Sequence, residues 1–338
     1  MKENDIRPDE FQARIDELAR QDKQYLLDRR DRFQAVDCPA CGSSHGHKSF
    51  EKIGTTYLKC PDCRTVYASP RPDPSLLAEY YQQSKNYAFW YEHVFPASED
   101  ARRKNIFRPR ARMVAEFVER CSVKPGTLLE IGAGFGTFGE EMKALGIFER
   151  IIALELTPTL AGKCRQRGLE VMECSVEEVS LSGLQADVVV SFETIEHLFD
   201  PLSVLQSCCQ VLNPGGVLML SCPNMLGLDT MTLGKQSSSV GGEHINMFNP
   251  QSIKLLLERA GFDVLDVKTP GKLDVELLRK KALDGELDLS TQPFLAEVLL
   301  ERFDDLAEPF QEFLAANNLS SHMLVVARKT DPGKKQDN

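Results

Sequence analysis

Residues 128–138, Leu-Leu-Glu-Ile-Gly-Ala-Gly-Phe-Gly-Thr-Phe, decide the fold of this chain. A short apolar run, typical of a buried strand, leads into glycines at positions 132, 134 and 136, and a helical pattern follows over about 136–145. Glycine lets the backbone turn tightly and lets a ligand approach it closely. A strand, a glycine loop and a helix in this order predict a binding site for a nucleotide-like cofactor.

The chain downstream alternates strands and helices. Strands are expected at 127–131, 151–155, 187–192, 217–221, 262–267 and 322–328, and helices at 136–145, 158–167, 202–212 and 251–260. This alternation predicts a parallel sheet with helices on both faces. Residues 213–216, Asn-Pro-Gly-Gly, predict a turn. Two helix-like pieces, 273–281 and 295–316, separate the last two strands and predict an insertion over one end of the sheet.

Two cofactors compete for the glycine loop. Residues 134–139 also fit the G-x-G-x-x-G pattern of dinucleotide sites, and Glu155, at the end of the second strand, would serve the ribose of either cofactor. Glu130 favours one of these two cofactors over the other. A carboxylate inside the first strand suits the cationic amino-acid end of S-adenosylmethionine (SAM) and would repel a pyrophosphate.

The glycine loop, Glu130, Glu155, the segment 213–220 and the final strand together carry a resemblance. Over about residues 110–330, the chain resembles the class I SAM-dependent methyltransferases. The resemblance implies a Rossmann-like α/β fold, in which a seven-stranded sheet has its last strand antiparallel and binds ligands at the carboxyl ends of the strands. It implies that the methionine moiety is held by Glu130, Gly132, Gly134 and Gly136, the ribose by Glu155, and the adenine by Ser175 and Val176.

A cluster of acids and histidines follows the fourth strand. Glu193, Glu196 and His197 are spaced so that they share one face of a helical turn, and His244 follows the fifth strand at the same edge. Three interpretations stay open. Glu196 and His197 orient the loop and cap the next helix; His197 or His244 acts as a general base without metal; or all four residues bind a divalent ion such as magnesium, manganese, iron or zinc.

The Glu-x-x-Glu-His pattern resembles that of metal-dependent 2′-O-methyltransferases of small RNAs and of ubiquinone-pathway O-methyltransferases. Both families act on vicinal hydroxyls. A metal chelated by two adjacent oxygens fixes their position and lowers the pKa of a hydroxyl. The resemblance therefore implies methyl transfer to a hydroxyl, with His197, His244, Glu193 and Glu196 as catalytic residues.

Two Cys-x-x-Cys pairs predict a structural zinc site. Cys38 and Cys41 are separated from Cys60 and Cys63 by a spacing typical of zinc ribbons. With such an N-terminal module, the chain resembles methyltransferases that act on sugars or glycan precursors. The part after the SAM loop is too short for the extra domain of the C-methyltransferases among them, so we favour O-methyl transfer.

The predicted organisation follows from these segments: an N-terminal helix (1–34), a zinc ribbon (35–70), a helical lid or linker (71–120), a SAM-dependent methyltransferase domain (121–330, with an insertion at about 270–320) and a disordered tail (331–338). In the lid, Tyr87, Trp90 and Tyr91 either stack on a sugar or base or pack the lid onto the core. Likewise, its basic run either meets phosphate or is solvated; the run comprises Arg102, Arg103, Lys104, Arg108, Arg110 and Arg112.

The composition limits the classes of binding partner that the protein is expected to have. Lysine and arginine number 40 against 50 aspartates and glutamates, a net charge of −10, which argues against a protein that wraps nucleic acid. The sequence has no apolar run long enough for a membrane span and no signal-peptide pattern, so a cytoplasmic protein is expected. The lead hypothesis is O-methylation of a small sugar-like acceptor. The alternatives are an RNA 2′-O-methyltransferase and an inactive zinc-ribbon interaction protein, and a homodimer stays open.

Overall fold

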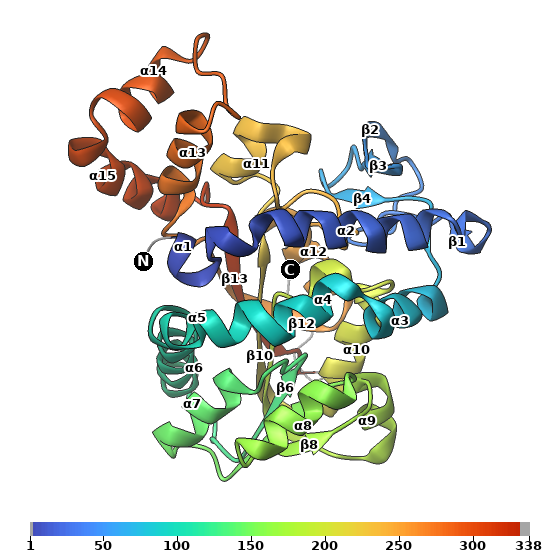
Figure 1. Cartoon of the computed structure of the whole chain (residues 1–338). Coiled ribbons are helices and arrows are strands. Elements are labelled where there is room, and N and C mark those ends of the chain that lie inside the picture. Colours follow the sequence, from blue (N-terminus) through green and yellow to red (C-terminus); the bar gives the residue numbers. More distant parts are fainter. Residues whose placement is uncertain (1–2, 332–338) are drawn as a thin grey trace, which may run out of the picture.

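The computed structural model describes residues 3–331 and centres on one mixed sheet (Figure 1). Its seven strands lie in the order β12-β13-β10-β9-β6-β7-β8. Their bounds are β6 Thr127–Ile131, β7 Arg150–Leu154, β8 Glu170–Met172, β9 Ala186–Phe192, β10 Leu212–Pro223, β12 Phe262–Lys268 and β13 His322–Lys329. Strands β6 to β10 pair in parallel, whereas β13 runs antiparallel to both of its neighbours. The predicted seven-stranded sheet with its last strand antiparallel is confirmed.

Helices cover both faces of this sheet. One apolar core joins Leu128 of β6 to α6 and α7, and a second joins Leu129, the next residue, to α9, α10 and α12. Because neighbouring residues of a strand point to opposite faces, both faces are buried and the strands are apolar throughout. The helices are α6 Arg108–Arg120, α7 Thr137–Leu145, α8 Pro158–Gln166, α9 Val176–Ser182, α10 Pro201–Val211 and α12 Pro250–Arg259.

The turn predicted at 213–216 lies inside strand β10 instead. The register of β10 against β9 shifts between Leu212 and Val217, so these residues form an irregular bulge. A side chain at Gly216 would lie 2.9 Å from the carbonyl oxygen of Asn213 and 3.0 Å from that of Asp187. The glycine therefore allows two strands to approach each other closely where the sequence indicated a chain reversal.

Residues 3–34 do not form the single helix that was predicted for the N-terminal segment. They comprise α1 Glu3–Ile6, η1 Asp9–Phe11, α2 Gln12–Leu27 and η2 Arg30–Arg32, and the break falls at Pro8, which lacks a backbone donor. Helix α2 lies alongside the lid helices in the centre of Figure 1. The carboxylate of Asp22 accepts hydrogen bonds from the Ser84 hydroxyl (2.6 Å) and from the amides of Lys85 (3.0 Å) and Asn86 (2.9 Å). Helix α2 thus caps the start of α4.

Residues 33–107 build a small sheet and a run of helices. The strands are β1 Phe33–Gln34, β2 His47–Lys52, β3 Thr55–Lys59, β4 Val66–Ala68 and β5 Arg71–Pro72. The helices are α3 Pro74–Gln83, α4 Lys85–Phe89, η3 Trp90–Val94, α5 Phe95–Arg102 and η4 Arg103–Phe107. The small sheet has the order β11-β4-β3-β2, and β11 (Asn246–Met247) comes from the loop after β10. The small sheet and the main domain therefore share a strand.

The predicted insertion is helical and has its own apolar core. It comprises α13 Asp274–Leu283, α14 Pro293–Ala296, η7 Glu297–Glu301 and α15 Phe303–Ala316, which pack with α11 Leu228–Leu233. The short η6 (Gly234–Gln236) follows α11 directly. These helices stand at one end of the molecule (Figure 1). Between residues 3 and 331 no helix combines the length and apolarity needed to cross a membrane. Residues 332–338 of the predicted tail lie outside the described chain.

Candidate functional site

The glycine loop lies at the carboxyl edge of the sheet, where β6 ends. Gly132, Gly134 and Gly136 all have positive φ (71°, 57° and 70°), but their surroundings differ. A side chain at Gly136 would lie 2.9 Å from the Cys164 sulfur and 3.1 Å from its Cα, so this glycine serves packing. One at Gly134 would meet no atom of the described chain within 4 Å. Gly134 is thus the position at which a ligand can approach the backbone.

Two carboxylates flank this loop. Glu130 is 4% exposed, and within residues 3–331 its Oε2 has no hydrogen-bond partner. Burial raises the pKa of Glu130 to about 8, although the Arg110 guanidinium opposes the shift. Glu155 accepts hydrogen bonds from the amides of Gly134 and Thr157, both at 2.8 Å, and burial raises its pKa. Glu130 thus offers a free oxygen to a cation, and Glu155 shapes the loop.

Ser175 and Val176 lie at the start of α9. The Ser175 hydroxyl accepts a hydrogen bond from the Glu178 amide at 3.3 Å, and the Ser175 amide donates to the Glu178 carboxylate at 2.8 Å. This reciprocal pair is a capping box. Val176 is buried in the main core. Both side chains therefore have structural contacts, and the adenine contact stays a prediction.

Glu196, His197 and His244 come together beyond the ends of β9 and β10. Each offers a ligand atom, and these atoms lie within 4.8 Å of one another. His197 Nδ1 lies 3.3 Å from the Glu243 carbonyl oxygen and His244 Nδ1 lies 2.8 Å from that of Ser239. Because a carbonyl only accepts, each Nδ1 carries a proton, and in the neutral form of either ring the Nε2 atom keeps a lone pair. Burial, and then His244, lower the pKa of His197, which favours the neutral ring.

Glu196 is the unusual member of this trio. It is 1% exposed, and nowhere in the described chain does either carboxylate oxygen find a hydrogen-bond partner. Burial, and then Glu193, raise its pKa well above the ordinary value. A buried carboxyl group without partners is costly, and an absent ion is one of the few explanations for it. The trio is therefore a group of side chains that could hold a metal ion, and backbone carbonyls orient its two histidines.

Glu193 is not part of that trio, although the spacing predicted a shared helical face. Its φ is +52°, and the 3-10 turn η5 (Ile195–His197) begins only two residues later, so the positions do not follow a helix. Its carboxylate accepts a hydrogen bond from Ser221 and lies 3.7 Å from Arg110 and 3.5 Å from His322. Although burial acts in the opposite direction, His322 and Arg110 hold the pKa of Glu193 below its ordinary value.

Aromatic rings connect the trio with the glycine loop. Ring centroids lie 6.4 Å apart for His197 and Tyr81, 5.5 Å for Tyr81 and Tyr87, 5.7 Å for Tyr87 and Tyr91, and 5.6 Å for Tyr91 and Phe135. The Tyr81 hydroxyl is buried, without a hydrogen-bond partner in residues 3–331. Sequence reasoning noted these aromatics but missed Tyr81 as a neighbour of the trio, because only the packing of α3 against η5 brings it there.

Two members of the basic run are paired with glutamates within the protein. Arg103 contacts Glu99 (2.9 Å), Glu140 (2.7 Å) and Glu141 (2.8 Å), and Arg108 contacts Glu141 (3.0 Å). Arg110 instead lies with its guanidinium carbon 4.4 Å from the centroid of the Phe192 ring, beside the site. Arg103 and Arg108 are therefore not free to bind phosphate, and Arg110 is the member that lies beside Glu193 and Phe192.

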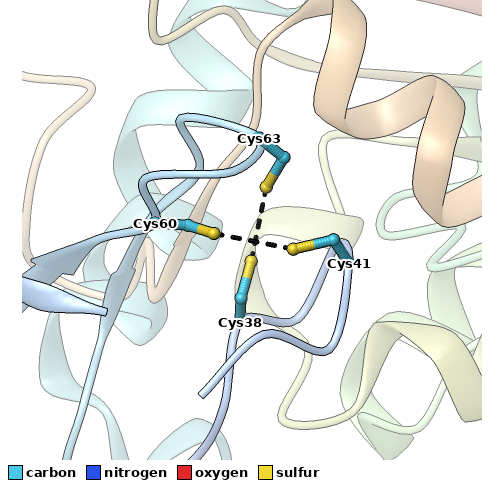
Figure 2. Close-up of side chains that lie close together, drawn as sticks. All are labelled: Cys38, Cys41, Cys60 and Cys63. Carbon is cyan, nitrogen blue, oxygen red and sulfur yellow. Dashed lines mark hydrogen bonds between the residues drawn. The ribbon is translucent and has the colours of Figure 1, made fainter. Parts of the chain in front are cut away.

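The four cysteines gather as their spacing predicted. In Figure 2 the sulfurs of Cys38 and Cys41, from one turn, point toward those of Cys60 and Cys63, from another. The Cys38–Cys63 and Cys41–Cys60 sulfur distances are both 3.5 Å, and all four sulfurs lie within 4.8 Å of one another. Sulfurs at about 2.3 Å from a tetrahedral zinc ion would be about 3.8 Å apart, so the cluster fits zinc.

Known proteins resemble this architecture. A family model described as a methyltransferase domain matches residues 102–267, which hold the glycine loop and Glu196. A relative from Mycolicibacterium smegmatis, described as a probable S-adenosylmethionine-dependent methyltransferase, is 28% identical over 215 residues, which cover 59% of this chain and 79% of that protein. The chain is a SAM-dependent methyltransferase.

The methyltransferase also has more distant similarities. A ubiquinone biosynthesis O-methyltransferase from Cereibacter sphaeroides is 29% identical over 162 residues, which cover 42% of this chain and 62% of that protein. A solved SAM-dependent methyltransferase from Archaeoglobus fulgidus aligns with 66% of this chain and 96% of its own, at 19% identity and a TM-score of 0.43. Several curated relatives are matched over only 46% to 62% of their length.

Proposed function

We propose that this methyltransferase transfers the methyl group of SAM to a hydroxyl of a small sugar-like or glycan-precursor acceptor, assisted by a divalent ion at Glu196, His197 and His244. The observation that carries this proposal is the buried Glu196 carboxyl, which has no hydrogen-bond partner in the described chain and lies beside two imidazoles, with His197 Nε2 at 3.8 Å. The relatives named as ubiquinone biosynthesis O-methyltransferases support oxygen as the acceptor atom.

The residues of the trio would share the work with a bound ion. When bound, a divalent ion supplies Lewis-acid polarisation of adjacent hydroxyls. Glu196 provides the negative charge, and the carbonyls of Glu243 and Ser239 hold the two rings with their Nε2 atoms available. A ring that does not bind the ion can accept the proton of the acceptor hydroxyl. Because SAM carries its own leaving group, alignment and deprotonation are the main tasks of the protein.

The proposed cofactor site follows the glycine loop. The free Oε2 of Glu130 receives the ammonium group of SAM, Gly134 lets the methionine moiety approach the backbone, Gly132 and Gly136 allow the turn of the loop, and Glu155 binds the ribose. Ser175 and Val176 remain the proposed adenine neighbours. The pKa of Arg110 is lowered by burial but supported by Glu193 and Glu130, and its guanidinium is placed to bind an anionic group of SAM or of the acceptor.

The four cysteines are proposed to bind one structural zinc ion. Cys38, Cys60 and Cys63 are buried and belong to the same core as the main sheet. This position suits a closed structural site, since three of the sulfurs cannot be reached by a substrate. The RNA alternative loses support because Arg103 and Arg108 are paired with glutamates, and because the net charge is −10.

Metal binding by variants tests the proposal. Purified full-length protein is stripped of loosely held metal and titrated with Mn²⁺, while zinc content and SAM affinity are followed separately. Glu196→Gln should abolish Mn²⁺ binding and retain one zinc per chain. Glu193→Gln, the matched control at the neighbouring carboxylate outside the trio, should keep Mn²⁺ binding. Equal Mn²⁺ binding by wild type and Glu196→Gln, or none by wild type, would remove the metal from the proposal.

A further inference from the structure

The segment that carries His244 is built into the zinc-ribbon sheet. Strand β11 pairs antiparallel with β4, with Asn246 opposite Tyr67 and Met247 opposite Val66. Just before this pairing, the Ala68 amide donates to the Ile245 carbonyl oxygen at 2.9 Å. Because β-pairing fixes the backbone at every second residue, the ribbon determines where the chain beside His244 lies.

A ribbon lysine holds the other side of the same loop. From β2, the Lys52 ammonium donates to the carbonyl oxygens of Ser237 (2.9 Å) and Val240 (2.6 Å). These two carbonyls bracket Ser239, whose own carbonyl accepts the Nδ1 proton of His244 at 2.8 Å. Lys52 therefore fixes the short turn that sets the ring orientation of His244.

One further hydrogen bond joins this segment to the ribbon, and another joins it to the turn of the trio. The Tyr57 hydroxyl donates to the His244 carbonyl oxygen at 3.3 Å, and Tyr57 is fully buried. On the far side of the loop, the Ile245 amide donates to the Glu196 carbonyl oxygen at 3.0 Å. The same short segment thus receives hydrogen bonds from the ribbon and passes one to the turn that bears Glu196 and His197.

The cysteine turns are joined to the main domain at both pairs. The Asn249 side chain, which caps α12 directly after β11, donates to the Cys63 carbonyl oxygen at 3.0 Å. At the other turn the Arg259 guanidinium, near the end of α12, donates to the Ala40 carbonyl oxygen at 2.6 Å. A disturbance of the cysteine cluster is therefore transmitted to both ends of α12 and to the segment before it.

We propose that the zinc ribbon is a positioning element of the active site: through Lys52, Tyr57 and the β4–β11 pairing it holds His244 and Glu196 in the geometry that binds the catalytic ion. The metal part of this inference rests on the proposed function. Binding at the cysteine cluster and at the trio is then coupled, and by linkage the coupling is reciprocal. Lys52 and Tyr57 act through His244 and do not touch the acceptor.

The test compares Lys52→Met with Lys48→Met in the full-length protein. Both lysines lie on β2, but Lys48 is 61% exposed and contacts only Glu51 among the partners described for it. Lys52→Met should retain one zinc and wild-type SAM affinity while Mn²⁺ affinity falls about tenfold or more, the usual effect of removing an outer-shell contact. Lys48→Met should match the wild type. Tyr57→Phe, which removes one hydroxyl from the same loop, should lower Mn²⁺ affinity in the same direction.

Hydrogen exchange separates this inference from the metal proposal. In metal-stripped protein that retains its zinc, amides of residues 239–247 should exchange about fivefold faster or more in Lys52→Met, as expected for the loss of one hydrogen bond. If wild type binds no Mn²⁺ but this acceleration is seen, the catalytic ion is wrong and the positioning role stands. Unchanged exchange in Lys52→Met and Tyr57→Phe overturns the positioning role.

Discussion

Arg71 is the side chain whose removal should most clearly separate the ribbon from the main domain. Its guanidinium is completely buried, and it donates to three oxygens: Ala68 O at 3.0 Å, Phe199 O at 3.1 Å and Asn246 Oδ1 at 2.9 Å. These oxygens belong to β4, to the segment after η5 and to β11. One cation thus joins the ribbon to the turn that follows the trio.

Arg71→Met fills much of the same volume without donating a hydrogen bond. Each of the three buried acceptors then loses a donor, at about 1–2 kcal/mol apiece. Part of this loss is offset, because a buried cation no longer has to be desolvated, and burial already lowers the pKa of Arg71 to about 10. The expected net destabilisation is about 3 kcal/mol, or roughly a 150-fold change in the unfolding equilibrium.

Urea unfolding of zinc-loaded protein measures this change, and hydrogen exchange of residues 66–72 and 195–200 locates it. Arg64→Met is the control, since Arg64 is exposed on the same ribbon. It should stay within about 0.5 kcal/mol of the wild type. A destabilisation by Arg71→Met of less than about 1 kcal/mol would show that the three acceptors find other donors, and would refute the bridging role.

Three further predictions concern the cofactor loop and the cysteines. Because burial raises the pKa of Glu130 to about 8, its carboxyl is protonated below that pH, whereas the ammonium group of SAM favours the carboxylate. SAM affinity measured by calorimetry should therefore fall as the pH drops below about 8, by up to about tenfold per pH unit. A wild-type SAM affinity that does not change with pH would contradict the binding of the ammonium group by Glu130. Gly134→Ala should lower the free energy of unfolding by about 1–2 kcal/mol, because alanine is strained at positive φ, and should also weaken SAM binding. Gly183→Ala, at another open position with positive φ, should have the same cost to folding but leave SAM affinity unchanged. Cys60→Ser should reduce bound zinc from one per chain to none and lower the melting temperature, whereas Cys121→Ser, outside the cluster, should retain the metal; zinc retained in Cys60→Ser would argue against the four-cysteine site.

Several features followed directly from local patterns. The strand before the glycine loop, the helix expected at 202–212 and the helix expected at 251–260 were predicted, because apolar periodicity acts over a few residues. The cysteine spacing predicted the cluster for the same reason, since two tight turns with paired thiols leave few other arrangements. These local preferences agree with the final fold, as is usual for an efficiently folding domain.

The candidate metal site was only partly predictable. The sequence identified Glu196, His197 and His244 but added Glu193, since spacing at i, i+3 and i+4 assigns a shared face only if the backbone is helical. The left-handed φ of Glu193 breaks that condition. The partners that neutralise the basic run could not be read either, because the glutamates of α7 meet Arg103 only after the helices pack.

The sequence by itself determined the individual strands, the glycine loop and the two cysteine pairs, because each depends on residues close together along the chain. Tertiary structure alone decided that the ribbon shares a strand with the loop of His244, and that Asp22 caps a helix more than sixty residues away. Such contacts join segments whose own patterns do not refer to each other. They form because the whole chain must satisfy its buried polar groups at once.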